Sequence, residues 1–241
     1  MKFLWFLPNT FTFLNLFFGC VAIVFGLNGH LELLGKFVLL GLICDFLDGF
    51  SARVLKIKSK IGVQLDSLSD LVTFGLTSSI VMFILLSNSN YIIESNSNSY
   101  IKLIPYISFL ITISSSYRLA KFNIDNNDSH FTGLPTPANA LMIVFLPFIF
   151  EINLFSDYVK ILENSFFLIL ITIISSYLLI SSLKMPSFKY QSFLTDFSQK
   201  RNWFKSIFII FSLGLIIAFN IAAFPIIILV YIMIGLFRIK F

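Results

Sequence analysis

Four aspartates lie close together in a chain that is otherwise poor in charge. They are Asp45, Asp48, Asp66 and Asp70, and no other acidic residue lies between positions 33 and 86. Carboxylates that converge in a partly dry environment repel one another unless cations lie between them. Hard divalent ions such as Mg²⁺ prefer carboxylate oxygens together with the phosphate oxygens of a substrate. The four residues therefore predict a metal site that handles a phosphate-containing ligand.

The spacing of the aspartates predicts two helices whose acidic faces meet. At 100° per residue, Asp48 lies about 60° from Asp45 around a helix axis, and Ala52 lies about 20° from Asp45. On the next helix, Asp66 and Asp70 are four residues apart and also share a face. The segment that connects the two helices is short, so they are expected to be antiparallel neighbours.

Small residues and one arginine accompany the aspartates. Gly49, Ala52 and Gly62 leave space where a large ligand would approach the backbone, and Arg53 adds a fixed positive charge suited to phosphate oxygens. Two simpler explanations exist: the acids could favour a helix N-terminus through the helix dipole, and the small residues could serve helix packing. The combination at these spacings favours a metal-dependent diphosphate site.

The elements that position these residues are expected to be membrane helices. Hydrophobic residues make up 57% of the 241 positions, mean hydropathy is +0.91, and 12% of the residues are charged, against about 25% in a soluble domain. Apolar runs of about 16 to 22 residues recur along the chain, which favours helices over the strands of about 10 residues found in a barrel. The expected fold class is an all-α, polytopic membrane helix bundle, with the site at the membrane–water boundary.

Eight transmembrane helices are expected. They cover residues 9–28, 33–56, 64–86, 101–120, 138–154, 164–183, 206–220 and 222–239. Little more than Asn220 to Pro225 separates the last two, so 206–239 is expected to be a helical hairpin. Residues 1–8 are expected to lie at the headgroups, and a cleaved signal peptide is less favoured because no small-residue cleavage site follows. The whole chain, 1–241, is expected to be one domain.

The distribution of basic residues predicts that both termini are cytoplasmic. With the N-terminus inside, 14 of the 17 basic residues fall at cytoplasmic ends and loops. They are Lys2, Arg53, Lys56, Lys58, Lys60, Arg118, Lys121, Lys184, Lys189, Lys200, Arg201, Lys205, Arg238 and Lys240. Lys36, Lys102 and Lys160 fall on the other side. Because the basic residues are dispersed without a concentrated stripe, the net charge of +5 does not predict a nucleic-acid partner.

The acidic stretch resembles a known signature. The pattern Asp45-x2-Asp48-Gly49-x2-Ala52-Arg53-x8-Gly62-x3-Asp66-x3-Asp70 is similar, position for position, to that of the CDP-alcohol phosphatidyltransferase family. The resemblance implies that Asp45, Asp48 and Asp66 bind metal ions. It implies that Asp70 assists with metal and serves as the general base. Gly49, Ala52, Arg53 and Gly62 would line the pocket for the CDP moiety.

The same resemblance carries expectations for the fold and the partners. It implies a six-helix core, to which the hairpin 206–239 is added, and a homodimer in the lipid bilayer. The polar cavity would open to the cytoplasm. The expected cofactors are divalent Mg²⁺ or Mn²⁺, with two ions expected.

Two further stretches bear on the acceptor alcohol. The N-terminal "LPNTFTFLNLFFG" and the downstream "YRLAKFN" and "FTGLPTPANA" resemble bacterial members of the family that transfer to serine. The resemblance implies CDP-diacylglycerol and L-serine as substrates, phosphatidylserine and CMP as products, and a place in the bacterial cytoplasmic (inner) membrane.

Five residues outside the signature are candidates for the substrate site. Arg118 and Lys121 lie three residues apart at the cytoplasmic end of the fourth span, where cations would select an acceptor carboxylate. They could also hold phosphates or be ordinary positive-inside anchors, and family members usually have Arg at the position of Lys121. Thr136 and Asn139 could contact the polar substrate or cap the fifth helix. Asn15 could reach the nucleotide or form a buried interhelical hydrogen bond.

Two other functions remain open at this point. One keeps the same chemistry with another acceptor, above all glycerol 3-phosphate, and more than one additional cation facing the cavity would favour it. The other is a membrane cation transporter or channel that uses the aspartates as a permeation site. The transporter is disfavoured because the aspartates gather at one membrane face and no acidic relay continues across the membrane.

Overall fold

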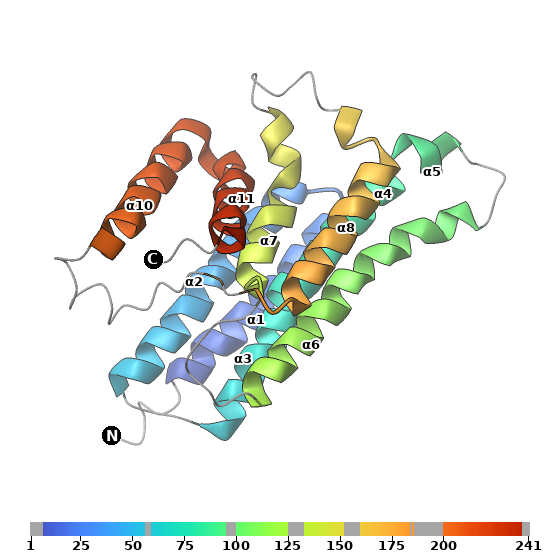
Figure 1. Cartoon of the computed structure of the whole chain (residues 1–241). Helices are drawn as coiled ribbons and strands as arrows, with labels where there is room; N and C mark the ends of the chain where they lie inside the picture. Colours follow the sequence, from blue (N-terminus) through green and yellow to red (C-terminus); the bar gives the residue numbers. More distant parts are fainter. Residues whose placement is uncertain are drawn as a thin grey trace.

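The computed structural model describes residues 7–55, 59–94, 100–124, 133–151, 160–183, 185 and 200–237, which contain helices and no strand. The α-helices are α1 (Leu7–Leu27), α2 (Leu31–Leu55), α3 (Lys60–Asp70), α4 (Thr77–Ser87), α5 (Asn90–Glu94), α6 (Leu110–Ile124), α7 (Thr136–Val144), α8 (Ser165–Ile180), α10 (Lys200–Phe219) and α11 (Ala223–Leu236). A π-helical segment, Leu71–Leu76, joins α3 to α4, and 3₁₀ segments cover Ile101–Phe109, Leu146–Glu151 and Asn220–Ala222. Each of the eight predicted spans overlaps one or more helical segments of the described residues (Figure 1).

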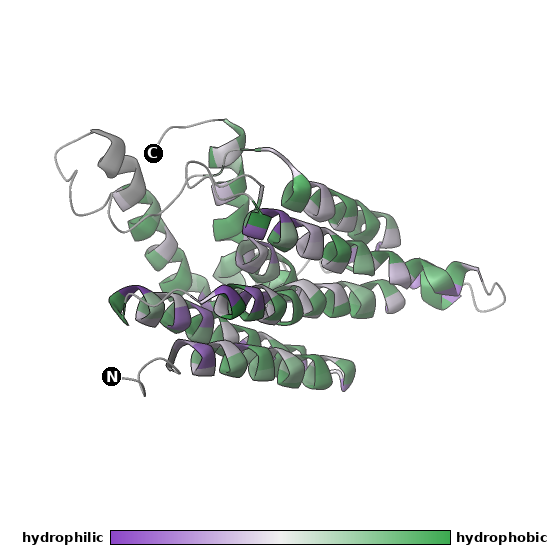
Figure 2. Cartoon of the chain, turned by 90° about the horizontal axis from the view of Figure 1, so that it is seen from below, coloured by the Kyte–Doolittle hydropathy of each residue, from purple (hydrophilic) through white to green (hydrophobic). Residues whose placement is uncertain are grey.

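The prediction of a polytopic helical membrane protein is confirmed. Among the described residues, Pro8–Leu27, Lys60–Ser87 and Ser206–Leu236 are long and apolar enough to cross a membrane, and Thr136–Phe150 and Ser165–Ile180 are shorter apolar helices. The helices are hydrophobic over most of their length (Figure 2). Residues 1–6 of the predicted interfacial segment lie outside the described part of the chain, and Leu7 and Pro8 belong to α1. The cytoplasmic position of the termini stays a prediction.

The core of the bundle brings α1, α2 and α3 together. α1 packs along α2 and α3, α6 packs against α8, and α7 contacts both α4 and α11 (Figure 1). A tight turn at Gly29 reverses the chain between α1 and α2: the amide of Gly29 donates to Gly26 O at 2.9 Å, and that of His30 donates to Phe25 O at 2.9 Å. This pair of bonds is a Schellman motif, which favours glycine because the residue has positive φ, here 83°. The turn makes α1 and α2 antiparallel neighbours.

The predicted C-terminal hairpin is present. α10 and α11 pack against each other and meet at Asn220, whose φ of 51° lies in the left-handed region and bends the chain (Figure 1). Asparagine tolerates this conformation better than most residues do. Pro225 lies in the first turn of α11, where a missing amide hydrogen costs no helical bond. The hairpin returns to the bundle through α11, which packs on α7.

A second tight turn attaches the start of α7 to the end of α8. The amide of Gly133 donates to Leu183 O and that of Leu134 donates to Leu178 O, both at 2.9 Å. Gly133 has φ 76°, and a Cβ there would lie 2.6 Å from Leu179 O and 3.0 Å from Ser181 O. Because the carbonyls at a helix C-terminus lack intrahelical donors, these bonds also satisfy α8. The turn before α7 is therefore held by backbone contacts.

We expect Gly133→Ala to lower the free energy of unfolding by about 2–4 kcal/mol, because left-handed strain adds to a clash with fixed carbonyl oxygens. Gly29→Ala is the matched control: its φ of 83° imposes the same strain, but nothing lies within 4 Å of its added Cβ. We expect the control to cost about 1 kcal/mol. Thermal unfolding of both variants in detergent measures the difference. Equal losses of stability would contradict the role assigned to the α8 carbonyls.

Candidate metal and substrate site

Three of the four predicted metal ligands converge. One carboxylate oxygen from each of Asp45, Asp66 and Asp70 lies within 4.8 Å of the others, with Asp45 on α2 and the other two on α3. The Oδ1 atom of Asp66 is buried and has no hydrogen-bond partner among the described residues. An acidic cluster with an unpartnered buried oxygen is suited to a divalent cation, which prefers oxygen ligands. The residues present therefore fit the expected metal.

The fourth aspartate, Asp48, is held from α1. The hydroxyl of Thr12 donates to Asp48 Oδ2, and the Thr12 carbonyl accepts a 3.0 Å hydrogen bond from Ser69 Oγ. Asp48 is 9% exposed and lies within electrostatic range of Asp66. The structure thus places Asp48 beside the three-carboxylate cluster, with its orientation set by a threonine that is absent from the predicted site.

Asp70 is also held from α1. The side-chain amide of Asn15 donates to Asp70 Oδ1 at 3.2 Å, and Thr73 Oγ1 donates to the Asn15 carbonyl at 2.8 Å. Gly41 of α2 allows this close packing, because a Cβ there would lie 2.6 Å from Thr73 Cγ2 and 3.0 Å from Asn15 Oδ1. The interhelical hydrogen bond considered for Asn15 is therefore present. Its contact with the nucleotide stays a prediction.

The helix changes its winding immediately after Asp70. The π-helical segment Leu71–Leu76 begins at the next residue, and hydroxyl groups there donate to backbone carbonyls: Thr77 to Thr73 O at 2.5 Å and Ser78 to Phe74 O at 2.5 Å. π-Helical turns are rare and occur frequently at functional sites. The change of winding lies between the aspartates of α3 and the buried polar face of α4.

A cavity of about 210 Å³ opens beside the aspartates, between α1, α2 and the start of α3. It is lined by Pro8, Asn9, Thr12, Asp48, Gly49, Ala52, Ser59, Gly62, Val63 and Asp66. Gly49, Ala52 and Gly62, which were predicted to line the nucleotide pocket, are among these residues. A Cβ on Gly49 would meet no atom nearer than Arg53 Nη2 at 4.0 Å, so the glycine borders open space. Arg53 is exposed, and its Nε donates to Gly49 O at 2.8 Å.

Three polar residues of this cavity escaped the sequence prediction: Asn9, Thr12 and Ser59. The signal for Thr12 is its place on the buried face of α1 with Asn15 and Gly19, at intervals of three and four residues in an apolar helix. Ser59 is the N-cap of α3, and its hydroxyl accepts a 3.2 Å hydrogen bond from the Gly62 amide. The polar positions of α1 could have been found by the same argument that found Asn15.

On the other side of Asp70 lies Arg118 of α6. Its guanidinium interacts electrostatically with Asp70, and Nη1 donates to Thr136 Oγ1 at 3.2 Å. The Nε of Arg118 is buried and has no hydrogen-bond partner among the described residues. Lys121, one turn farther along α6, is exposed. The structure therefore buries the Nε of Arg118 and leaves Lys121 exposed, and the role of Lys121 stays a prediction.

Thr136 and Asn139 lie in a buried polar layer and do not cap α7. The N-cap residue is Pro135, with no side-chain capping bond, whereas Asn139 Oδ1 accepts a 2.6 Å hydrogen bond from Ser175 Oγ of α8. Both Thr136 and Asn139 are 1% exposed, and the Asn139 Nδ2 lacks a hydrogen-bond partner among the described residues. Two buried donors, on Arg118 and Asn139, thus have no acceptor among the residues that the structure describes.

These features agree with the relatives of the chain. The family model of the CDP-alcohol phosphatidyltransferases matches residues 5–178. The chain belongs to this family. CDP-diacylglycerol–serine O-phosphatidyltransferases from Helicobacter pylori (strain J99) and Methanocaldococcus jannaschii are 32% and 34% identical over 144 and 187 residues. These matches cover 58% and 78% of the chain.

The relatives are matched over different shares of their length, and their names state different acceptor alcohols. The matched segment spans 56% of the Helicobacter protein and 77% of the Methanocaldococcus protein. A phosphatidylcholine synthase from Borreliella burgdorferi is 30% identical over 149 residues, 60% of the chain and 59% of that protein. The relatives therefore differ in the acceptor alcohol that their names state.

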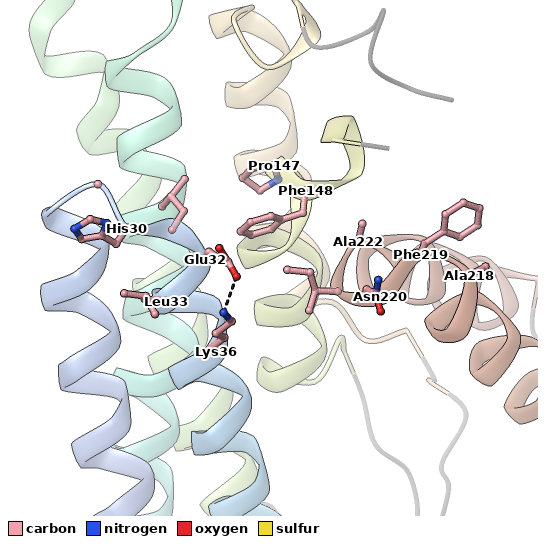
Figure 3. A pocket seen from close by; sticks show the side chains of 13 residues that line it. His30, Glu32, Leu33, Lys36, Pro147, Phe148, Ala218, Phe219, Asn220 and Ala222 are labelled. Carbon is pink, nitrogen blue, oxygen red and sulfur yellow. Dashed lines mark ion pairs between the residues drawn. The ribbon is translucent and has the colours of Figure 1, made fainter. Parts of the chain in front are cut away.

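Membership in the CDP-alcohol phosphatidyltransferase family supports a divalent metal at the acidic cluster, because the family is metal-dependent. A larger cavity among the described residues lies elsewhere. It measures about 1110 Å³ and is lined by the start of α2, the 3₁₀ segment Leu146–Glu151 and the α10–α11 bend (Figure 3). Its two charged side chains, Glu32 and Lys36, form an ion pair at 2.6 Å. Asp45 is nine residues beyond Lys36 on α2, about 14 Å along the helix, so this cavity is separate from the acidic cluster.

Proposed function

We propose that the chain transfers the phosphatidyl group of CDP-diacylglycerol to the hydroxyl of L-serine, which yields phosphatidylserine and CMP. The observation that carries the acceptor is Arg118, whose Nε is buried with no hydrogen-bond partner among the described residues and whose Nη1 donates to Thr136. Serine brings a carboxylate that this donor would bind, and a guanidinium matches the geometry of a carboxylate. The names of the Helicobacter and Methanocaldococcus relatives support the same acceptor.

The site is divided between the two substrates. The cavity lined by Gly49, Ala52 and Gly62 has the small residues that admit the CDP moiety, with Arg53 at its rim for phosphate oxygens. The acyl chains would stay in the bilayer, against the exposed apolar side chains of α1 and α2, such as Phe17. Both substrates would then meet at the aspartates.

The reaction needs one proton transfer and one nucleophilic substitution at phosphorus. The serine hydroxyl oxygen forms a bond to the phosphorus that bears diacylglycerol, the bond from that phosphorus to the bridging oxygen breaks, and CMP leaves with that oxygen. Asp70 accepts the hydroxyl proton as general base, while Asn15 orients its carboxylate. Asp45, Asp48, Asp66 and Asp70 would hold the divalent ions, whose chemistry is to neutralise charge on the diphosphate.

Two other acceptors fit the same family. Glycerol 3-phosphate would be favoured by further cations facing the site, and the exposed position of Lys121 offers no support for it. Choline, suggested by the name of the Borreliella relative, is a cation and would be repelled by Arg118. Arg118 thus favours an acceptor that carries a carboxylate, such as serine.

The acceptor is tested with the purified protein, CDP-diacylglycerol and Mg²⁺ or Mn²⁺. We expect CMP release to depend on L-serine and to exceed the release with choline or inositol by at least about 10²-fold, because a site built for a carboxylate leaves buried donors unpaired with neutral or cationic acceptors. Release with glycerol 3-phosphate or choline but not with serine would contradict the proposal.

We also propose the setting of the reaction. The excess of basic residues at one set of helix ends supports a site that faces the cytoplasm, in the bacterial cytoplasmic membrane. A homodimer is expected from the family resemblance. The packing of α11 on α7 supports a single domain over residues 1–241. Labelling of single cysteines introduced beside Lys60 and beside Lys102 in sealed vesicles would test the orientation.

A further inference from the structure

The side chain of Asn139 on α7 is oriented from the neighbouring helix α8. Its Oδ1 accepts a 2.6 Å hydrogen bond from Ser175 Oγ, and the two side chains are 1% and 0% exposed. A side-chain amide has one acceptor end and one donor end, so a bond to Oδ1 fixes the side to which the Nδ2 hydrogens point. Nδ2 is buried and has no hydrogen-bond partner among the described residues. Ser175 therefore holds Asn139 with its donor end unpaired.

This buried amide is not explained by the needs of its neighbours. A buried donor without a partner loses its hydrogen bond to water, and most buried polar groups in proteins are paired. Ser175 does not require the amide, because a serine in a helix can donate to a carbonyl of its own helix. Thr172, one turn earlier on α8, does so with Leu168 O at 2.9 Å. The amide is therefore suited to a group that enters the bundle from outside the chain.

Asn139 lies one helical turn from the contact between Arg118 and α7. That contact is the 3.2 Å hydrogen bond from Arg118 Nη1 to Thr136 Oγ1, and residues three apart on a helix share a face with their Cβ atoms about 5–6 Å apart. Both α6 and α7 pack on the π-helical segment Leu71–Leu76, which begins directly after Asp70. The unpaired Nε of Arg118 and Nδ2 of Asn139 thus belong to two helices that meet beside the segment following Asp70.

We propose that Asn139 is a second donor to the carboxylate of the acceptor, beside Arg118, and that Ser175 is the positioning residue that orients it. The inference rests on the proposed function, because it requires an acceptor that carries a carboxylate. A carboxylate has two oxygens and can accept one hydrogen bond from a guanidinium and another from an amide. An acceptor without the carboxylate leaves Nδ2 unpaired, so Asn139 contributes to the choice of substrate.

Asn139→Ala removes the second donor and leaves Arg118 and Thr136 in place. We expect the KM for L-serine to rise by about 10-fold, the effect of losing one hydrogen bond to a charged group. The kcat and the KM for CDP-diacylglycerol should stay within about twofold of the wild type. Initial rates of CMP release in detergent, with each substrate varied in turn, measure these constants. Equal rises in both KM values would show a structural role and overturn the proposal.

Ser175→Ala tests the positioning role while the donor is kept. We expect the KM for serine to rise by about 3- to 5-fold, because the amide loses the bond that orients it. Thr172→Val is the matched control, because it removes a buried hydroxyl from the same helix, and it should leave the KM for serine unchanged. Equal rises in these two variants would overturn the positioning role. Ser175→Ala also decides the outcome where Asn139→Ala lowers the melting temperature, since alanine fits the space of serine and favours a helix.

A double-mutant cycle shows whether Ser175 acts through Asn139. In the Asn139→Ala background, Ser175→Ala should change the KM for serine by less than about twofold, because the group that Ser175 orients is already absent. Effects that multiply in the double variant would contradict the positioning role.

The failure of this inference is distinguishable from the failure of the proposed function. A wild-type protein that turns over serine, with an Asn139→Ala variant whose KM for serine stays within about twofold of it, would overturn the inference alone. A wild-type protein that uses another acceptor and ignores serine would overturn the proposed function, and with it the assignment of Asn139 to a carboxylate.

Discussion

Asp70→Asn is expected to lower the rate of CMP release by about 10³-fold or more, because it removes the general base and one charge of the metal cluster. Asn has nearly the same shape as Asp, and its side-chain oxygen can still accept the hydrogen bond from Asn15 that Asp70 Oδ1 accepts. Binding of CDP-diacylglycerol should therefore be largely retained. Single-turnover CMP release and nucleotide binding, measured on the same detergent-solubilised preparation, separate the two effects.

The control for Asp70→Asn is Glu32→Gln, which removes an acid from the first turn of α2, away from the acidic cluster. Glu32 pairs with Lys36, and both side chains are more than half exposed, at 63% and 57%. An exposed pair contributes at most about 1 kcal/mol to stability, so this variant should keep normal turnover. Near-normal turnover in Asp70→Asn would show that another group takes the serine proton.

Removal of divalent ions is expected to stop CMP release altogether, and added Mg²⁺ or Mn²⁺ should restore it. The physical reason is the convergence of Asp45, Asp66 and Asp70 within 4.8 Å. Three carboxylates at this separation repel one another and repel a diphosphate unless cations lie between them. Activity in excess EDTA, compared with activity in EDTA already saturated with Mg²⁺, measures the dependence. CMP release that persists in excess EDTA would contradict the metal site.

A second measurement of the metal site does not depend on turnover. Calorimetric titration of the metal-free protein with Mn²⁺ should show binding, and Asp66→Asn should weaken that binding because it removes a ligand whose Oδ1 has no other partner among the described residues. Glu163→Gln, on the segment before α8, should leave Mn²⁺ binding unchanged. Equal binding by the Asp66 and Glu163 variants would place the metal away from the acidic cluster.

Much of the fold was predictable because the membrane makes helix formation almost obligatory. A run of about 20 apolar residues must satisfy its backbone internally, and so each predicted span overlaps helical segments of the described residues. The hairpin was predictable from Asn220 and Pro225, which interrupt an otherwise continuous apolar run. The π-helical segment after Asp70 was not, because no residue type marks a change of helical winding.

The acidic site was predictable because its ligands come from two sequence-adjacent helices joined by a short connection. Helical periodicity alone places Asp45 near Asp48 and Asp66 near Asp70, and the short connection brings the two faces together. The periodicity did not show that Thr12 holds Asp48, because that contact spans 36 residues and depends on how α1 packs against α2. Nor did the i, i+3 spacing of Arg118 and Lys121 show that the first is directed inward and the second is exposed.

The amino-acid sequence by itself therefore determined the membrane helices, the family and the acidic signature, because each follows from local composition or from spacing along one or two helices. Only the tertiary structure decided which polar groups meet across the bundle: Asn15 with Asp70, Arg118 with Thr136, and Ser175 with Asn139. The first of these contacts joins residues that are 55 positions apart. Such contacts depend on helix rotation and packing, which in lipid are set by close fit and buried hydrogen bonds rather than by hydrophobicity.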